Sequence, residues 1–295
     1  MASVDILKAT AYLADPENLQ AVFKAASQTS DLDPEKFQIL DADTVKLPVY
    51  QFGGAGLPDY IRQTSIAGAN AGYTQIDLIK TWETFKLTQH KGAQLVLDVL
   101  DDEESKGEGI IKWVNEFTRQ RIVPTVDKYR LSVLATSTPA VTGALTNANI
   151  WDVIDVAFEK FTVDEVPLDR LLLYVSAATY TKMKRSAGFT QNIIQGSWGN
   201  SIDTNVSLYN GAKIVVVKGD RLPNGVNFIL VASQVVTTCV KYHETVLYPP
   251  KTVAGNSRDF IADWNMDYDL FTINKGAPVT PGDDPTLVGI YVHTI

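Results

Sequence analysis

The sequence predicts an α+β fold, and three stretches of it carry that prediction. In 258–274, "RDFIADWNMDYDLFTIN", apolar and polar residues alternate, which is typical of a half-buried strand in an antiparallel sheet. Apolar residues at helical spacing over about 103–134 predict a long helix. Asn210-Gly211, between two strand-like runs, is the strongest short hairpin signal in the chain.

The composition is that of a large globular protein. The chain has 295 residues, of which 45% are hydrophobic and 20% charged, so one large or two small domains are expected. Lys and Arg number 26 against 34 Asp and Glu, for a net charge of −8. This balance argues against a protein whose main task is to grip phosphates. Cys239 is the only cysteine, so no intrachain disulfide can form and a reducing compartment suits the chain.

The N-terminus does not resemble a signal peptide, because it has no basic start and carries Asp5 where a signal peptide would be apolar. The longest apolar runs are far shorter than the ~20 residues that span a bilayer. We therefore expect a protein made inside the cell that does not enter a membrane.

Residues 1–45 are predicted to form an arm. A short amphipathic helix at Glu17–Ala26 is followed by a polar stretch with too few apolar residues for a core of its own. Residues 46–98 then predict a long two-stranded ribbon whose tip, near 62–75, is rich in Gly, Ala, Ser and Asn. A two-stranded ribbon is marginal in water and needs a third strand or an apolar support, which the adjacent sequence does not supply.

The long helix is expected over about Glu103–Leu134. Its apolar spacing changes phase near Pro124, which lacks a backbone donor and should kink the helix. The acids at 101–104 stand at its start, where negative charge interacts favourably with the helix dipole, so they require no metal.

Residues 147–251 predict a compact mixture of helices and strands. A helix follows Asn147 or Asn149 as its candidate cap, and Ser176 is the expected cap of a second helix after the buried strand "RLLLYV". The Asn210-Gly211 hairpin and the core strand "VNFILVA" come next, and "GIYVHTI" closes the chain as a last strand.

The sequence contains no familiar catalytic or nucleotide-binding motif. The glycines of "GGAGLP" lack the lysine of a phosphate loop, and His90, His243 and His293 show neither helical pairing nor a metal spacing. "QGSWGN" does not meet the pattern of a nucleophile elbow. We predict neither an enzyme nor a cofactor.

The best metal candidates are Asp263, Asp267 and Asp269. With Asn265 they mimic the first ligands of a calcium loop, but Tyr268 stands where that pattern requires glycine. Along one face of a strand such side chains stand about 7 Å apart, too far for one ion without further ligands. A solvated acidic face is expected, unless a subunit boundary supplies the missing ligands.

Four runs, "GLPDYIRQTS", "TWETFKLTQHKG", "LDVLDDEES" and "RIVPTVDKYR", resemble the major capsid proteins of tailed bacteriophages of Gram-positive hosts, which have the Hong Kong 97 type of shell fold. The resemblance is most specific over 55–134; over 140–250 only the order of elements matches. His90-Lys91-Gly92 departs from the acid and arginine that usually precede this glycine, and Ser105 replaces the usual threonine after two acids.

The resemblance implies four parts: an N-terminal arm (1–45), an extended loop or E-loop (46–98), a peripheral domain with a long spine helix (99–146 and 252–275), and an axial domain (147–251 and 276–295). It implies a structural subunit that assembles through hexamers and pentamers into an icosahedral shell around double-stranded DNA, in the virion after assembly in the host cytoplasm. Head-to-tail contacts generate such closed rings. The subunit contacts expected are Phe52, Tyr60, Arg62, Trp82, Phe85, Leu87 and Lys91.

The implied partners are other copies of the chain, a separate scaffolding protein, a portal protein and decoration proteins. A separate scaffold is expected because no scaffold-like segment or protease target is evident before residue 40. DNA would be enclosed without sequence-specific binding, since an acidic wall lets it pack without adhering. Two alternatives stay open: an encapsulin-like nanocompartment shell that holds a protein cargo, and a hydrolase with an inter-domain site dependent on His243 or Asp263.

Overall fold

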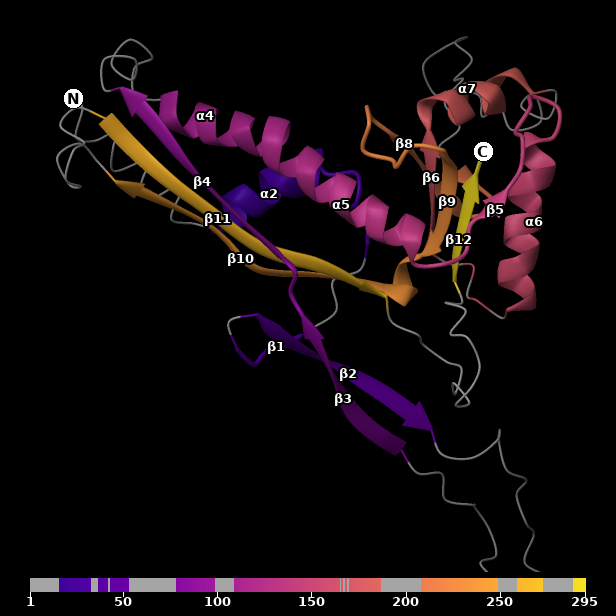
Figure 1. The fold of residues 1–295 in the computed structure, drawn as a ribbon, viewed down its shortest axis with the longest axis horizontal. Helices are drawn as coiled ribbons and strands as arrows, with labels where there is room; N and C mark the ends of the chain where they lie inside the picture. Colours follow the sequence, from indigo (N-terminus) through magenta and orange to yellow (C-terminus); the bar gives the residue numbers. More distant parts are fainter. Residues whose placement is uncertain are drawn as a thin grey trace, which may run out of the picture. The chain divides into compact units, whose positions relative to one another are not determined.

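The computed structural model describes residues 16–32, 37–41, 43–52, 78–98, 109–164, 166, 168, 170–186, 208–248, 259–272 and 289–295 (Figure 1). The chain divides into two compact units, one of Glu35–Thr88 and one of Met1–Pro34 with Gln89–Ile295. The expected loop tip near 62–75, the acids at 101–104 and the predicted contacts Tyr60 and Arg62 lie outside the described residues.

The smaller unit is an antiparallel sheet in the order β1-β2-β3. Strands β2 (Thr44–Phe52) and β3 (Leu78–Lys86) form the ribbon that the sequence predicts, with Val45 opposite Phe85 and Pro48 opposite Trp82. Strand β1 (Gln38–Ile39) pairs with β2 and comes from residues expected to belong to the arm. It supplies the third strand that a ribbon needs for stability in water.

Strand β4 (Gln89–Asp98) lies outside that sheet. It pairs antiparallel with β11 (Asp259–Thr272), which also pairs with β10 (Val236–Tyr248), in a sheet of order β10-β11-β4. The β2–β3 pairing therefore ends at Lys86, whereas the ribbon was expected to extend to residue 98. The prediction failed because alternation in the sequence identifies a strand without identifying the strand that pairs with it. The four-part division of the chain remains a prediction.

The long helix is a rod of three segments on one face of the β10-β11-β4 sheet (Figure 1): α4 (Gly109–Phe117), a π-helical turn (Thr118–Ile122) and α5 (Val123–Thr136). The kink expected near Pro124 stays a prediction; what the structure shows there is a π turn immediately before the proline, which cannot donate a backbone hydrogen bond to the preceding turn. Val114, Ile122 and Val126 are buried, as the apolar spacing predicts.

Helix α2 (Pro16–Ala26) packs with this rod, which confirms the amphipathic helix predicted in the arm. Phe23 of α2 shares a core with Val126 of α5 and with Trp264, Met266 and Tyr268 of β11. The alternation of β11 is confirmed over 262–268, because these three residues are buried on the face toward the helices, but Asp269, predicted on the solvated acidic face, is buried as well.

The larger unit contains a further sheet, which has six strands in the order β5-β12-β9-β6-β8-β7. We call it the axial sheet. Its strands are β5 (Val141–Thr142), β6 (Leu171–Ser176), β7 (Leu208–Tyr209), β8 (Ala212–Val217), β9 (Val226–Ala232) and β12 (Ile290–Thr294). Helices α6 (Ile150–Val163) and α7 (Ala177–Arg185), with the end of α5, pack against it in one core (Figure 1).

Local signals in this region are confirmed. Ser176 caps α7, because its Oγ accepts a hydrogen bond from the Thr179 N–H at 3.1 Å. Asn210 and Gly211, with φ of 47° and 83°, form the turn between β7 and β8. Asn149 occupies the cap position of α6, but its side chain accepts from the Thr146 N–H instead of from the helix. No helix in the described part of the chain is long and apolar enough to span a membrane.

Candidate assembly surfaces and a buried junction

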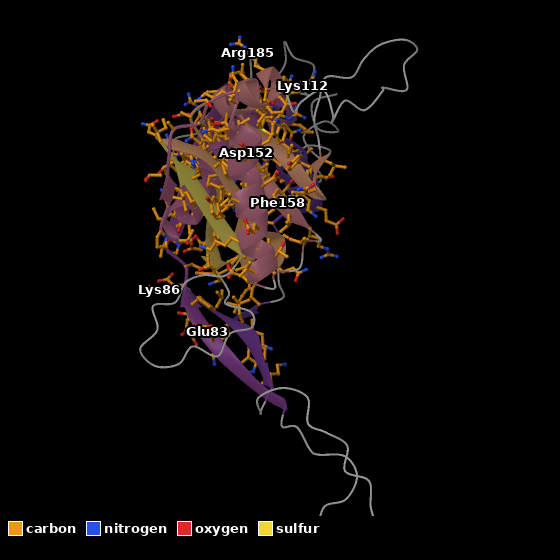
Figure 2. The ribbon with its side chains drawn as sticks, turned by 90° about the vertical axis from the view of Figure 1, so that its right-hand side faces the viewer. Glu83, Lys86, Lys112, Asp152, Phe158 and Arg185 are labelled. Carbon is orange, nitrogen blue, oxygen red and sulfur yellow. The ribbon has the colours of Figure 1, made fainter. Side chains whose placement is uncertain are left out.

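One face of the β2–β3 ribbon is basic. Because residues opposite each other in an antiparallel pair share a face, this face carries Lys46, Lys80, Trp82, Thr84 and Lys86, which we call the basic face. Figure 2 labels Lys86 of this face. Trp82 is 40% exposed, and the Lys80 ammonium lies 4.8 Å from its ring centroid. An exposed tryptophan among lysines combines apolar area with positive charge, a combination that suits contact with an acidic protein surface.

The opposite face of the ribbon mixes covered and exposed side chains, and Glu83, opposite Leu47, is exposed. Val45 and Leu47 are buried, and Phe85 shares their face and is half-buried. Trp82 and Phe85 therefore lie on opposite faces, where a single bare apolar side was expected.

Leu87 corrects that expectation further, because it is only 1% exposed within its own chain. Its backbone N–H donates to the Asp43 carbonyl at 2.7 Å, which fixes the residue directly after β3. A neighbouring subunit is not needed to cover it.

The other predicted contact residues are placed as follows. Phe52 ends β2 opposite Leu78, and Lys91 is exposed on β4 opposite Met266. The structure therefore leaves Trp82 and Lys91 accessible.

The β10-β11-β4 sheet turns its second face away from the helices. We call it the outer face; its described members are His90, Gly92, Gln94, Val96, Val246, Tyr248, Ile261, Asp263, Asn265 and Asp267. Val96 is 59% exposed and Val246 37%, and they flank the acidic positions of β11. The outer face thus offers carboxylates beside apolar side chains, the complement of the basic face.

The acids proposed as metal ligands have separate partners. Asp263 accepts from Gln94 Nε2 at 2.8 Å, Asp267 Oδ1 lies 3.0 Å from His90 Nδ1, and buried Asp269 accepts from Tyr129 Oη at 2.6 Å. Within the described ranges, no group of three or more His, Cys, Asp or Glu side chains could hold a metal ion.

A buried ionic junction joins α5 to the segment after α2 and to Arg221 after β8, and sequence reasoning missed it. Asp127 of α5 is fully buried. Its Oδ1 accepts from the Ser27 and Thr29 hydroxyls, each at 2.7 Å, and its Oδ2 accepts from the Gln28 N–H at 3.0 Å and from Arg221 Nη1 at 2.8 Å. These partners are 94 to 100 residues away along the chain, so no local pattern indicates them.

Arg130, one turn after Asp127, completes the junction. It is 3% exposed, its Nη1 donates to Thr29 Oγ1 at 3.1 Å, and its guanidinium carbon lies 5.7 Å from the Phe23 ring centroid. Burial lowers the pKa of Arg130, and the charge of Asp127 opposes that shift. The spacing of Asp127 and Arg130 on one helix face is the one signal in the sequence that could have pointed here.

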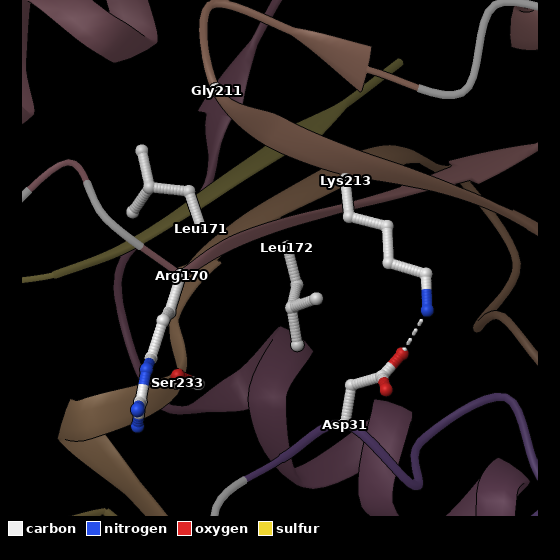
Figure 3. A pocket seen from close by; sticks show the side chains of 7 residues that line it. All are labelled: Asp31, Arg170, Leu171, Leu172, Gly211, Lys213 and Ser233. Carbon is white, nitrogen blue, oxygen red and sulfur yellow. Dashed lines mark hydrogen bonds and ion pairs between the residues drawn. The ribbon is translucent and has the colours of Figure 1, made fainter.

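A cavity of about 330 Å³ opens beside the axial sheet (Figure 3). Its lining residues are Asp31, Arg170, Leu171, Leu172, Gly211, Lys213 and Ser233. Lys213 Nζ lies 2.6 Å from Asp31 Oδ2, so these two charges compensate each other. The lining offers neither a histidine nor a cysteine, and Ser233 is its single hydroxyl side chain.

The hydrolase alternative gains no support from this geometry. In the β10–β11 ladder His243 is opposite Met266, whereas Asp263 is opposite Val246. The two positions are therefore separated by three steps, about 10 Å along the strand, and neither lines the cavity.

Comparison with known proteins identifies the fold. No known family profile and no curated protein sequence matches the chain. Among solved structures, the head structure of Helicobacter pylori bacteriophage KHP40 is similar at 11% identity, with a TM-score of 0.59, over 91% of this chain and 90% of that one. A Microbacterium phage Oxtober96 chain is similar at 14% identity, with a TM-score of 0.56 and the same coverage.

The capsid structure of cyanophage P-SCSP1u is similar at 11% identity, with a TM-score of 0.53, over 87% of this chain and 84% of that one. At such identities the similarity establishes the fold alone. The α+β, Hong Kong 97-type capsid fold expected from the sequence is confirmed for this chain.

Proposed function

We propose that this chain is the major capsid protein of a tailed bacteriophage. It is a structural, non-enzymatic subunit that assembles through hexamers and pentamers into an icosahedral shell around double-stranded DNA. The observation that carries the proposal is the shared fold with phage head and capsid structures over about nine-tenths of the chain. The net charge of −8 fits a wall that encloses DNA without gripping it.

The contact between subunits joins the basic face of one copy to the outer face of another. Charge supports this pairing, because Lys80 and Lys86 form a local positive surface on an acidic protein. The outer face presents Asp263 and Asp267, so opposite charges attract on approach.

Apolar area supports the same pairing. Trp82 lies among the lysines of the basic face, while Val96 and Val246 stand beside the acids of the outer face. Burying these side chains against each other would favour association at ~25 cal/mol per Å² of apolar surface. Each contact can be modest, since a closed shell repeats it many times.

Other predicted contacts stay part of the proposal without belonging to this pairing of faces. Phe52, Tyr60, Arg62, Phe85 and Lys91 remain proposed subunit contacts, whereas Leu87 is left out because its own chain buries it. The proposed partners are a separate scaffolding protein, a portal protein and decoration proteins. Assembly in the host cytoplasm precedes incorporation in the virion.

A charge-swap experiment tests this function. We expect the wild-type chain, expressed with its scaffold, to form shells visible by electron microscopy. The variant K80E/K86E should remain unassembled, and D263K/D267K should fail in the same way. Combining all four substitutions in one chain should restore shells, because the two swapped faces again carry opposite charges.

The matched control is K24E/K160E, which changes the same charge at exposed lysines outside both faces. It should assemble normally. Assembly by both charge-swapped variants alone would refute the contact, and a wild-type chain that stays monomeric with its scaffold would refute the function. Particles that carry a protein cargo in place of DNA would favour the compartment shell.

A further inference from the structure

The segment Ser27–Asp31, directly after α2, touches two parts of the larger unit at once. We call it the strap. On one side it meets α5 through the buried carboxylate of Asp127, which receives bonds from the side chains of Ser27 and Thr29 and from the backbone of Gln28. Both hydroxyl-bearing residues of this group are themselves buried. A buried charge with this many donors is strongly held, because breaking the set would leave it without compensation.

The other side of the strap meets the edge of the axial sheet. Strand β7 pairs with β8 only at Ala212 and Lys213, so Gln28 lies against a part of the β8 edge that β7 does not reach. Gln28 Nε2 donates to the Val216 carbonyl at 2.6 Å, and its Oε1 accepts from the Lys218 N–H at 3.0 Å. The side-chain amide thereby takes the place of a neighbouring strand.

Two further contacts tie the strap and the helix to the same strand. Asp31 pairs with Lys213 at the start of β8, with both side chains about half exposed. Arg221, which follows β8, reaches back to Asp127 with a side chain that is 14% exposed. One carboxylate on α5 therefore collects bonds from the strap and from the axial region.

We propose that the strap is a latch that fixes the spine helix to the axial sheet, with Asp127 as its anchor. The reason is that the hydrogen bonds of the strap go to α5 on one side and to the axial sheet on the other. Gln28 donates its backbone N–H to Asp127 and binds the β8 edge with its side chain, so the two attachments share one residue. Releasing the strap from α5 should therefore also release it from the axial sheet, and the helix and sheet could then move relative to each other.

The test follows one amide that the mutated residue does not touch. In the unassembled full-length chain, hydrogen exchange of the Lys218 N–H reports the strap on the axial side. The variant D127N keeps the shape of the side chain but replaces one accepting oxygen by a donating amide. We expect exchange at Lys218 to be at least tenfold faster than in the wild type, while amides of β9, which report global unfolding, change less.

The matched control is Lys128→Met. Lys128 is the next residue of α5, and its Nζ lies 2.9 Å from Oδ2 of Asp220, two residues after Lys218 in the sequence. Both side chains of this pair are largely exposed. This control should leave the Lys218 amide unchanged, because an exposed pair contributes little. If D127N does not fold, S27A/T29V serves in its place, because it removes two of the donors to Asp127. This variant should also accelerate exchange of the Lys218 amide, but by a smaller factor.

The latch is overturned by either of two results. The first is exchange of the Lys218 amide at the wild-type rate once the strap bonds to Asp127 are removed, which would make the two attachments independent. The second is acceleration of this exchange by Lys128→Met as large as by D127N. Neither result depends on shell formation, so this test and the test of the proposed function fail separately.

Discussion

The axial sheet and the β10-β11-β4 sheet differ in how completely the chain covers them. Consecutive residues of β6 and β9 are buried, so both faces of the axial sheet are closed there. In β11 buried and more exposed residues alternate over most of 261–268, and only the face toward α2 and the spine helix is covered. The described residues of the chain close both faces of one sheet and leave one face of the other sheet exposed, as on the basic face of the ribbon.

The largest predicted effect is the difference in lost stability between replacing a buried aromatic side chain and replacing an exposed one. Phe228→Ala should lower the free energy of unfolding by ~3–5 kcal/mol, since Phe228 is fully buried and stacks on Tyr291. Trp82→Ala should change it by less than ~1 kcal/mol and weaken assembly instead. Urea unfolding of the unassembled chain checks both values. Equal losses of stability would break the comparison.

Two glycines next to strands of the axial sheet sharpen the comparison. Gly289 has φ of 96°, and a Cβ there would lie 2.6 Å from Val235 Cγ2, whereas Gly219, with φ of 62°, would meet nothing within 4 Å. Gly289→Ala should therefore cost about 2–3 kcal/mol from backbone strain and overpacking, and Gly219→Ala about 1 kcal/mol from strain alone. Thermal unfolding of the two variants under one condition compares them, and a Gly219→Ala loss as large as that of Gly289→Ala would contradict the packing argument.

A smaller effect concerns His293, which the axial sheet buries. Burial lowers the pKa of His293, so the unfolded chain binds this proton more readily than the folded chain. Stability should fall as pH drops below about 6.5, the ordinary pKa of histidine. His293→Gln should flatten this dependence between pH 7 and pH 5, measured by urea midpoints. An unchanged slope would show that His293 is not the responsible group.

The smallest effect is expected on the outer face. Asp263→Asn keeps an oxygen that can accept a hydrogen bond from Gln94, so the free energy of unfolding should change by less than ~0.5 kcal/mol. Assembly should nevertheless become less sensitive to salt, because one attractive charge is lost from the proposed contact. Light scattering across a salt series checks this. A large loss of stability would mean that the acid supports its own chain.

What the sequence could predict depends on the range of the interaction. The burial of Trp264, Met266 and Tyr268, the turn at Asn210-Gly211 and the cap at Ser176 follow from residues within a few positions of each other. The fold as a whole followed from the family resemblance.

Features that depend on distant partners did not follow from any local pattern. The pairing of β4 with β11 joins residues about 170 apart, as in the Gln94–Asp263 bond. The donors to Asp127 are likewise scattered over the chain. Leu87 was misjudged because its apolar character says only that it needs cover, without saying that its own chain provides it.

The most direct measurement is a cryo-electron microscopy reconstruction of the assembled particle at side-chain resolution. The account predicts a closed shell in which Lys80 and Lys86 of one copy lie within about 4 Å of carboxylates on the outer face of another, with Trp82 against Val96 or Val246. A shell in which the basic face and the outer face both point to solvent would contradict it.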